Sequence, residues 1–237
     1  MSERPIDVII PAFNEEASIG KVLADIPGDL VRRVVVVDNG STDRTAETAA
    51  AAGAVVVHEP VRGYGNACLA GLRHIANDAP LIVTFLDGDY SDRPEEMTAL
   101  VRPLLDGSAD LVVGSRVTGE REPGALLPQA RFGNWLATSL IRLLYGERMT
   151  DLGPFRAILW SRLTELAMCD RDFGWTVEMQ VKAARSGLRY REIPVSYRKR
   201  IGTSKITGTL SGSVRAGWKI LYTIFRLRGV NPFRASS

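Results

Sequence analysis

Residues 80–92 read Pro80-Leu81-Ile82-Val83-Thr84-Phe85-Leu86-Asp87-Gly88-Asp89-Tyr90-Ser91-Asp92 and are the most informative segment of this chain. The apolar run 81–86 has the length of one buried strand, and it stops at two aspartates that are separated by one glycine. Ligands of open α/β sheets bind at the carboxyl ends of parallel strands. Two carboxylates there can share a hard divalent cation, Mg²⁺ or Mn²⁺, that also holds a diphosphate. Asp87 and Asp89 are therefore candidate metal ligands, although such pairs also solvate strand ends or cap helices.

The segments around this run alternate between strand and helix patterns. Strand patterns cover residues 6–11, 34–37, 54–58, 81–86 and 111–113. Helix patterns cover 15–26, the stretch from the Ser41-Thr42-Asp43 start signal to Gly53, 65–76, and a segment that opens at Pro94. Continuous β-branched runs between helices favour a parallel sheet that is covered on both faces. The sequence therefore predicts the α/β class, with a mostly parallel, Rossmann-like sheet flanked by helices.

The second half of the chain is less regular. Residues 118–129 contain Gly and Pro and predict a mobile loop, 131–145 and 175–186 predict helices, and 188–197 predicts a strand. A last helix is expected at 213–227, with Val214, Trp218, Leu221 and Phe225 on one stripe and Arg215, Lys219 and Arg226 on another. This pattern is typical of a helix that lies in a membrane interface; a helix that packs on the body or on a second subunit is the alternative.

Composition limits the remaining choices. A chain of 237 residues with 45% hydrophobic residues is expected to form one catalytic domain at 1–212, followed by the helix and tail at 213–237. Cys68 and Cys169 lie too far apart in the sequence for a metal motif, so a reducing compartment is expected. We expect neither a signal peptide nor a transmembrane run of about 20 apolar residues. These features predict a cytoplasmic protein that is at most peripheral to the membrane.

The charge is distributed unevenly along the chain. From Arg185 onward, twelve Lys or Arg residues accompany one acidic residue, Glu192, although the net charge is only +3. A cationic tail implies a polyanionic partner, which phosphate esters, an anionic membrane surface or a nucleic acid would satisfy. The basic tract lacks an RNA-binding signature, and the Asp-x-Asp pair repels phosphates unless a metal is present. A nucleic-acid-binding module is therefore the weaker alternative, and no nucleic-acid partner is expected.

Three further segments are expected at the sheet edge that holds Asp87 and Asp89. They are Pro11-Ala12-Phe13-Asn14-Glu15, Asp38-Asn39-Gly40-Ser41 and Arg62-Gly63-Tyr64-Gly65. Each is also a common turn or helix start, so it is their joint spacing that indicates a ligand site. A dinucleotide fingerprint would need a third glycine where Cys68 stands, and the sequence contains no P-loop Gly-Lys-Ser or Gly-Lys-Thr.

With these motifs the chain resembles the inverting family 2 glycosyltransferases of GT-A fold, especially polyprenyl-phosphate hexosyltransferases such as dolichol-phosphate mannose and glucose synthases. The resemblance covers roughly residues 5–212. It implies that Asp87 and Asp89 bind the metal and diphosphate, with Asp89 the more direct ligand. Ser91 stands where some relatives carry a glutamine ligand, so no third protein ligand is identified. The nucleotide-binding residues that the resemblance implies are Pro11, Ala12, Glu15, Asp38, Gly63 and Asp87.

Downstream motifs extend the resemblance. Gly114-Ser115-Arg116 and Arg131 resemble segments that serve phosphates, and Trp175-Thr176-Val177-Glu178 resembles the segment with an acid near the sugar. Asp151-Leu152-Gly153-Pro154-Phe155-Arg156 resembles the family's Asp-x-x-Gly-Phe-Arg, with Pro154 as a departure. The basic run 198–205 resembles a phosphate clamp, and a solvated surface run is the alternative. The implied catalytic residues are Asp87, Asp89, Arg116, Arg131, Asp151 and Glu178, and the implied phosphate-binding residues are Arg131, Arg198, Arg200, Ser204 and Lys205.

The reaction that the resemblance implies is metal-dependent, inverting transfer of a hexose from a GDP- or UDP-linked nucleotide-sugar to a polyprenyl phosphate. The cytoplasmic face of a membrane would be its location. The two histidines, His58 and His74, are expected to be structural. A phosphate acceptor is already ionised at neutral pH and needs no base. A family 2 enzyme with a soluble acceptor is the alternative, and Glu178 or Asp151 would then be the candidate base.

Overall fold

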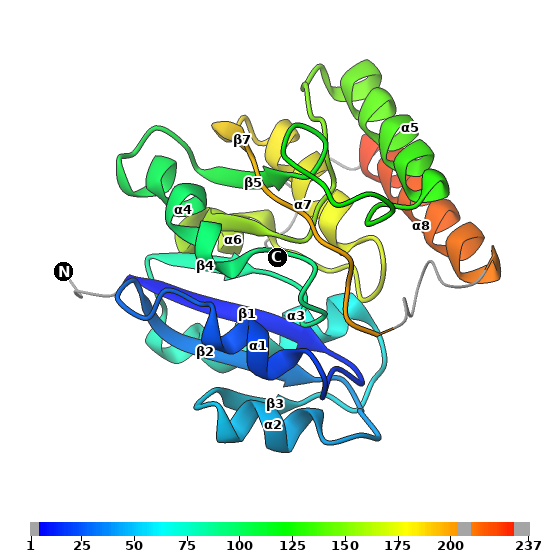
Figure 1. Ribbon diagram of the computed structural model, residues 1–237. Helices are drawn as coiled ribbons and strands as arrows, with labels where there is room; N and C mark the ends of the chain where they lie inside the picture. Colours follow the sequence, from blue (N-terminus) through cyan, green and yellow to red (C-terminus); the bar gives the residue numbers. More distant parts are fainter. Residues whose placement is uncertain (1–4, 203–209, 230–237) are drawn as a thin grey trace.

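A computed structural model describes residues 5–202 and 210–229 of the chain. In this part of the chain, one seven-stranded sheet has the order β3-β2-β1-β4-β6-β5-β7 (Figure 1). All strands run in the same direction except β6, which is antiparallel to both of its neighbours. The strands are β1 (Ile6–Ala12), β2 (Val31–Asp38), β3 (Val55–His58), β4 (Ile82–Phe85), β5 (Leu111–Ser115), β6 (Arg156–Leu159) and β7 (Tyr190–Pro194).

Helices cover both faces of the sheet. α1 (Ile19–Ala24), α2 (Thr45–Ala51) and α4 (Met97–Leu105) contribute to the core on one face, and α3 (Tyr64–Ile75), α6 (Trp160–Leu166) and α7 (Trp175–Arg185) to the core on the other. α5 (Pro128–Tyr145) and α8 (Leu210–Arg228) pack on α7 as an outer layer. Short 3₁₀ turns, η1 (Ala76–Asp78) and η2 (Pro94–Glu96), follow α3 and precede α4.

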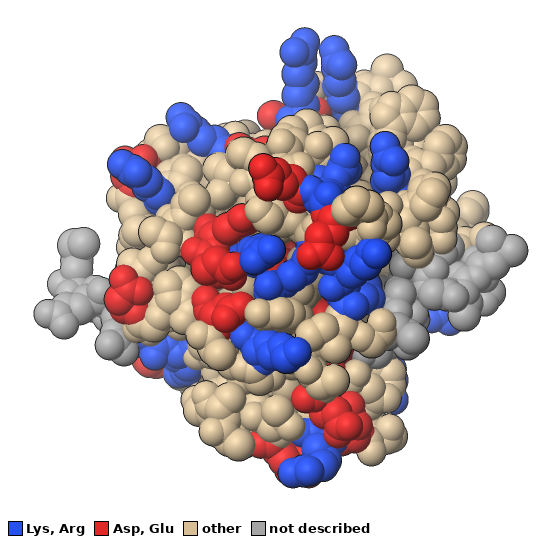
Figure 2. Space-filling view, in the orientation of Figure 1, with Lys and Arg blue, Asp and Glu red and all other residues tan. Residues whose placement is uncertain are grey.

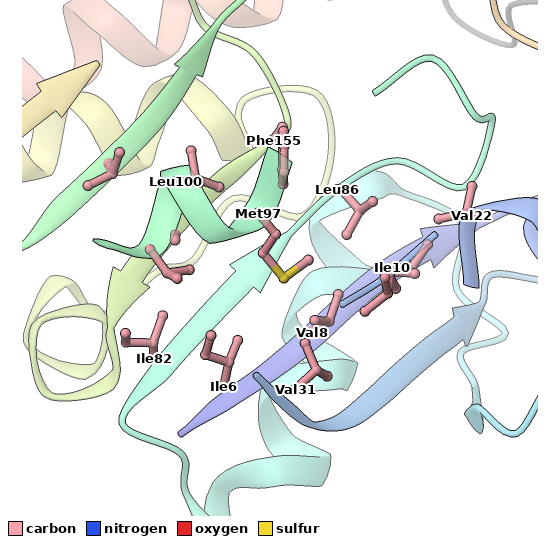
Figure 3. Close-up of a cluster of buried hydrophobic side chains, with 14 of the residues drawn as sticks. Ile6, Val8, Ile10, Val22, Val31, Ile82, Leu86, Met97, Leu100 and Phe155 are labelled. Atoms are coloured by element: carbon pink, nitrogen blue, oxygen red, sulfur yellow. The ribbon is translucent and has the colours of Figure 1, made fainter. Parts of the chain in front are cut away.

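Alternation along the strands separates the two cores. Val8 and Ile10 of β1 belong to the cluster that contains Met97 and Leu100 of α4 (Figure 3). Ile9 points to the opposite face and belongs to the cluster with Trp175. Because both faces of β1 are buried, its residues 8–12 form a continuous apolar run rather than an alternating one.

The predicted fold class is confirmed, and the differences lie in individual elements. The helix expected at 15–26 is limited to α1, because Ser41 and Thr45 side chains accept hydrogen bonds from the backbone of Asn14 and Glu15 and hold these residues outside the helix. β2 is longer than predicted, since Arg32 and Arg33 pair inside the strand region with the buried Asp7. β6 and α6 were not expected, because each is short and neither has a clear period.

The last helix has two distinct apolar faces. Ile224 and Leu227 of α8 are buried against α5 and α7, while Val214, Trp218 and Phe225 are more than half exposed. Packing on the body therefore leaves the outer stripe without a partner among the described residues. The domain boundary expected after residue 212 falls inside α8. Among residues 5–202 and 210–229, no helix combines the length and hydropathy that a membrane span requires.

Candidate active site

The ends of β1, β2 and β4 meet at one edge of the sheet. In the strand register Ala12 lies beside Asp38, and Asp87 and Asp89 follow β4 on the other side of β1. A cavity of about 350 Å³ opens there, and we call it the strand-end pocket. Its walls include Pro11, Ala12, Phe13, Glu15, Asn39, Arg62, Gly63, Tyr64, Asp87, Asp89, Phe173, Arg200 and Arg215.

A second cavity, of about 750 Å³, lies between the loop that precedes α5 and the amino-terminal halves of α5 and α8. We call it the inter-helix cleft. Small and apolar residues line most of its length, and Arg116, Lys199 and Arg200 line its polar part. The two cavities share Tyr64, Asp87, Phe173 and Arg200, so they meet beside Asp87. In Figure 2, acidic and basic side chains lie next to one another near the centre of this face.

Two carboxylates stand at the junction. Asp87 is half-buried, and its buried Oδ1 has no hydrogen-bond partner among the described residues. Burial, followed by the charge of Asp89, raises the pKa of Asp87 to about 7. Asp89 is 4% exposed; its Oδ2 lies 2.9 Å from Arg200, and its Oδ1 accepts the backbone N–H of Ser91.

This donor set fits a divalent cation. Two buried carboxylates one residue apart repel each other, and one of them has a free oxygen, so a cation would offset both costs. No group of three or more His, Cys, Asp or Glu among the described residues is close enough to chelate a metal. Mg²⁺ and Mn²⁺ sites that bind phosphates usually take only one or two protein carboxylates, and the substrate and water supply the rest.

A third acid of this region, Asp92, was missing from the predicted site. Both of its carboxylate oxygens are buried without a partner among the described residues, as is the hydroxyl of Ser91. Burial, and then the charge of Asp87, raises the pKa of Asp92 to about 8. The run 87–92 contains three aspartates, and this spacing was the available signal.

Arg116 and Asp151 form a bidentate pair. The Nε and Nη2 atoms of Arg116 lie 2.8 and 2.7 Å from the two Asp151 oxygens, and the Arg116 backbone N–H also binds Asp151. Burial lowers the pKa of Arg116, but the charge and hydrogen bonds of Asp151 outweigh this effect and raise the pKa above its usual value. Arg116 lines the inter-helix cleft, whereas Asp151 is fully buried behind it. Asp151 is therefore placed to position Arg116 rather than to act as a base.

Besides the buried Asp151, three of the implied catalytic and phosphate-binding residues line neither cavity. Glu178 is fully buried and accepts hydrogen bonds from the backbone of Cys169 and Asp170, and from the Cys169 thiol, so the prediction of an acid beside the sugar does not match its place. Arg198 stacks on the Tyr90 ring and donates to backbone carbonyls of residues 90 and 92, so it is not free to bind phosphate. Arg131 is exposed and lines a neighbouring groove on α5 instead of the inter-helix cleft.

The predicted nucleotide-binding residues lie near the strand-end pocket. Pro11, Ala12, Glu15 and Gly63 line it. Asp38 does not; its carboxylate accepts the Ser41 N–H and contacts His58 Nδ1 at 3.2 Å, while Asn39 takes the place in the wall. Arg200 lines both cavities. Ser204 and Lys205 lie outside the described residues.

Several residues of the walls had no individual role in the sequence analysis, although Phe13, Arg62 and Tyr64 belong to segments that it placed at this edge. Tyr64 and Phe173 line both cavities, and the buried Tyr64 hydroxyl has no partner among the described residues. Arg62 stacks on Phe13, with its guanidinium carbon 3.4 Å from the ring centroid. Arg215 reaches the strand-end pocket from α8, a contact between segments that no local pattern reveals.

The chain is similar to known glycosyltransferases in sequence. The family model described as glycosyl transferase family 2 matches residues 7–164. An uncharacterised glycosyltransferase of Mycobacterium tuberculosis is 39% identical over 227 residues, covering 93% of this chain and all of that protein. A dolichyl-phosphate hexose transferase of Haloferax volcanii is 33% identical over 210 residues (87% and 88% of the two chains), and an undecaprenyl-phosphate mannosyltransferase of Micrococcus luteus is 30% identical over 220 residues (86% and 88%).

A solved structure resembles the chain over most of its length. The glucosyl-3-phosphoglycerate synthase of Mycobacterium tuberculosis, in complex with Mn²⁺, uridine-diphosphate-glucose and phosphoglyceric acid, has a TM-score of 0.72 and 26% identity. The match covers 96% of this chain and 81% of that one. The sheet, the acid pair after β4 and these matches agree, and the chain belongs to glycosyl transferase family 2.

Proposed function

We propose that this glycosyltransferase catalyses metal-dependent, inverting transfer of a hexose from a nucleotide-sugar to a polyprenyl phosphate at the cytoplasmic surface of a membrane. The observation that carries this proposal is the inter-helix cleft, because its chemistry changes along its length. Its end at Asp87 is lined by Arg116 and Arg200, and its course between α5 and α8 is lined by Ala130, Gly133, Ala216, Gly217 and Ile220. A polyprenyl phosphate is likewise charged at one end and apolar along the rest of its length.

The strand-end pocket is the proposed donor site. Asp87 and Asp89 would hold Mg²⁺ or Mn²⁺ there, and the bound ion would stabilise the negative charge that grows on the departing diphosphate. The solved relative that binds Mn²⁺ and uridine-diphosphate-glucose supports this assignment. Arg200 lines both cavities and its guanidinium lies 2.9 Å from Asp89. It is therefore placed to stabilise the negative charge of the leaving diphosphate.

The acceptor side of the proposal requires positioning rather than proton transfer. A phosphate monoester is ionised at neutral pH and can attack the anomeric carbon directly, which inverts that centre in a single displacement. Arg116 has its guanidinium fixed by Asp151, so it can screen the acceptor charge from the negative donor. No histidine lines either cavity, which agrees with a reaction that does not need a base.

The outer faces of α5 and α8 supply the proposed membrane contact. Phe132 and Trp135 on α5 are 62% and 61% exposed, and Trp218 on α8 is 70% exposed. Arg131, Arg142, Arg226 and Arg228 lie on the same two helices. Aromatic residues beside cations favour the interface of an anionic bilayer.

A soluble phosphorylated acceptor is the second candidate. The solved relative contains phosphoglyceric acid, a small acceptor that would also fit beside Arg116 and Arg200. In that case the apolar walls between α5 and α8 would have no ligand to cover them.

The test is incubation with radiolabelled nucleotide-sugars, Mn²⁺, and either polyprenyl phosphate or phosphoglyceric acid, followed by extraction with organic solvent. We expect label in the organic phase only when polyprenyl phosphate is present. Label that stays in an aqueous product with phosphoglyceric acid, and none in the lipid, would select the second candidate. Arg116→Gln should reduce transfer to either acceptor without reducing the binding of the donor.

A further inference from the structure

α8 contributes to the wall of the strand-end pocket as well as to the outer surface. Arg215 lines this pocket, and its guanidinium lies 5.5 Å from the centroid of the Phe173 ring. It makes no hydrogen bond or ion pair within the part of the chain that the structure describes. The guanidinium is therefore available to an anionic ligand of the pocket.

The loop beneath Arg215 is residues 169–174, which we call the junction loop. It carries Phe173, which like Tyr64 lines both cavities, and Asp172 of the strand-end pocket. The junction loop is held by α7 and by α3. Glu178 accepts backbone N–H groups of Cys169 and Asp170, and a Cβ at Gly65 would overlap the Asp170 carbonyl oxygen, so the loop packs directly on the backbone of α3.

The junction loop is also held by α8. Lys219 Nζ lies 2.9 Å from Oδ2 of Asp170, whose side chain is 2% exposed. The other oxygen of Asp170 accepts the backbone N–H groups of Asp172 and Gly174, so this one carboxylate fixes the turn on both sides of Phe173. Removal of its cationic partner would leave a buried carboxylate without charge compensation.

We infer that α8 completes the donor site: Arg215 binds the diphosphate of the nucleotide-sugar, and Lys219 positions the junction loop through Asp170. The inference rests on the donor half of the proposed function and is independent of the acceptor. Arginine suits this role because its planar fork binds phosphate oxygens in pairs. Lys219 lines neither cavity and is a positioning residue.

The experiment is titration of the full chain with UDP and with GDP in the presence of Mn²⁺, by calorimetry and without any lipid. We expect Arg215→Gln to weaken binding of the preferred diphosphate about tenfold, the loss of one charge-assisted contact. Lys219→Met should weaken it several-fold, and Lys219→Arg, which keeps the charge, should restore binding to within about twofold of the original. Arg102→Gln is the control, because it removes an exposed charge from α4 that lines neither cavity.

The outcomes separate the two claims. If the unmodified chain binds no nucleoside diphosphate, the proposed function fails. If it binds one and Arg215→Gln binds it equally well, the inference is wrong. Circular dichroism melting shows whether each variant folds. If Lys219→Met does not fold, the binding measured for Lys219→Arg decides whether the charge at position 219 matters. Equal weakening in Lys219→Arg and Lys219→Met would contradict the positioning role.

Discussion

At the scale of single residues, the proposed role of Asp89 as a metal ligand can be tested directly. It is nearly buried, its Oδ2 faces Arg200, and its neighbour Asp87 has a free buried oxygen. Asp89→Asn keeps the shape and removes one negative charge, so we expect Mn²⁺ to lose most of its effect on UDP or GDP binding. The measurement is calorimetric titration with and without Mn²⁺. Asp25→Asn, which changes an acid outside both cavities, is the control, and an unchanged metal effect in Asp89→Asn would contradict the assignment.

Asp110 gives a prediction about stability and pH. Hydrogen bonds from Arg189, which act against burial, lower the pKa of Asp110 to about 2 from its ordinary value of 3.8. A carboxyl group with a lowered pKa contributes stability above its unfolded pKa, and this contribution is lost as the pH falls from about 4 to about 2. Because Arg189 is half exposed, we expect the contribution to be about 1–2 kcal/mol.

Arg189→Gln should therefore lower the free energy of unfolding by about this amount at pH 7 and by much less near pH 2. Urea unfolding at a series of pH values measures the difference. Arg73→Gln, which breaks an exposed pair with Glu59, should change the free energy by less than about 1 kcal/mol. A pH-independent difference between Arg189→Gln and the original chain would rule out this explanation.

At the scale of elements, the outer face of α8 can be tested apart from its inner face. Deletion of α8 would uncover Val177 and Val181 of the core, so a loss of membrane binding after deletion would be ambiguous. Trp218→Ser together with Phe225→Ser alters only exposed side chains. We expect this double variant to bind vesicles of phosphatidylcholine and phosphatidylglycerol at least about tenfold more weakly, because two large apolar contacts are lost.

Sedimentation with vesicles measures this effect, and Leu81→Ser is the matched control. Leu81 is 49% exposed but lies at the amino end of β4, away from α5 and α8. Binding of the control should equal that of the original chain, and it should weaken as salt is added, since the cations contribute. Vesicle binding that is unchanged in the double variant would mean that the α8 stripe is not the contact.

At the scale of the whole molecule, donor binding should stabilise the fold. A ligand at 100 times its Kd adds about 2.7 kcal/mol to the free energy of unfolding, which is roughly 5–10 °C in Tm for a chain of this size. A thermal-shift panel of UDP, GDP, ADP and CDP with Mn²⁺ or Mg²⁺ therefore identifies the base and the metal together. ATP with Mg²⁺ controls for non-specific triphosphate binding, and equal shifts for all nucleotides would argue against a selective donor pocket.

The same scale shows what the sequence could predict. The parallel strands and the acids that follow β4 are local patterns, and they were predicted because each buried strand is apolar and ends in turn residues. The place of Glu178 and Arg198 was not predictable in this way, since their partners in residues 169–170 and 90–92 come from other elements. Arg215 was assigned to a surface helix, and only the packing of α8 on α7 brings it to the pocket.

The reversed direction of β6 has a consequence for how segments reach the ligand edge. Arg156, its first residue, pairs with Phe85, the last residue of β4, so this strand starts where its neighbours stop. The chain consequently arrives at that rim just before β6, and it delivers Asp151 behind Arg116 without a separate crossover. One inverted strand thus adds an incoming segment to an edge that the parallel strands supply only with outgoing ones, and two residues of this segment, Leu152 and Pro154, line the inter-helix cleft.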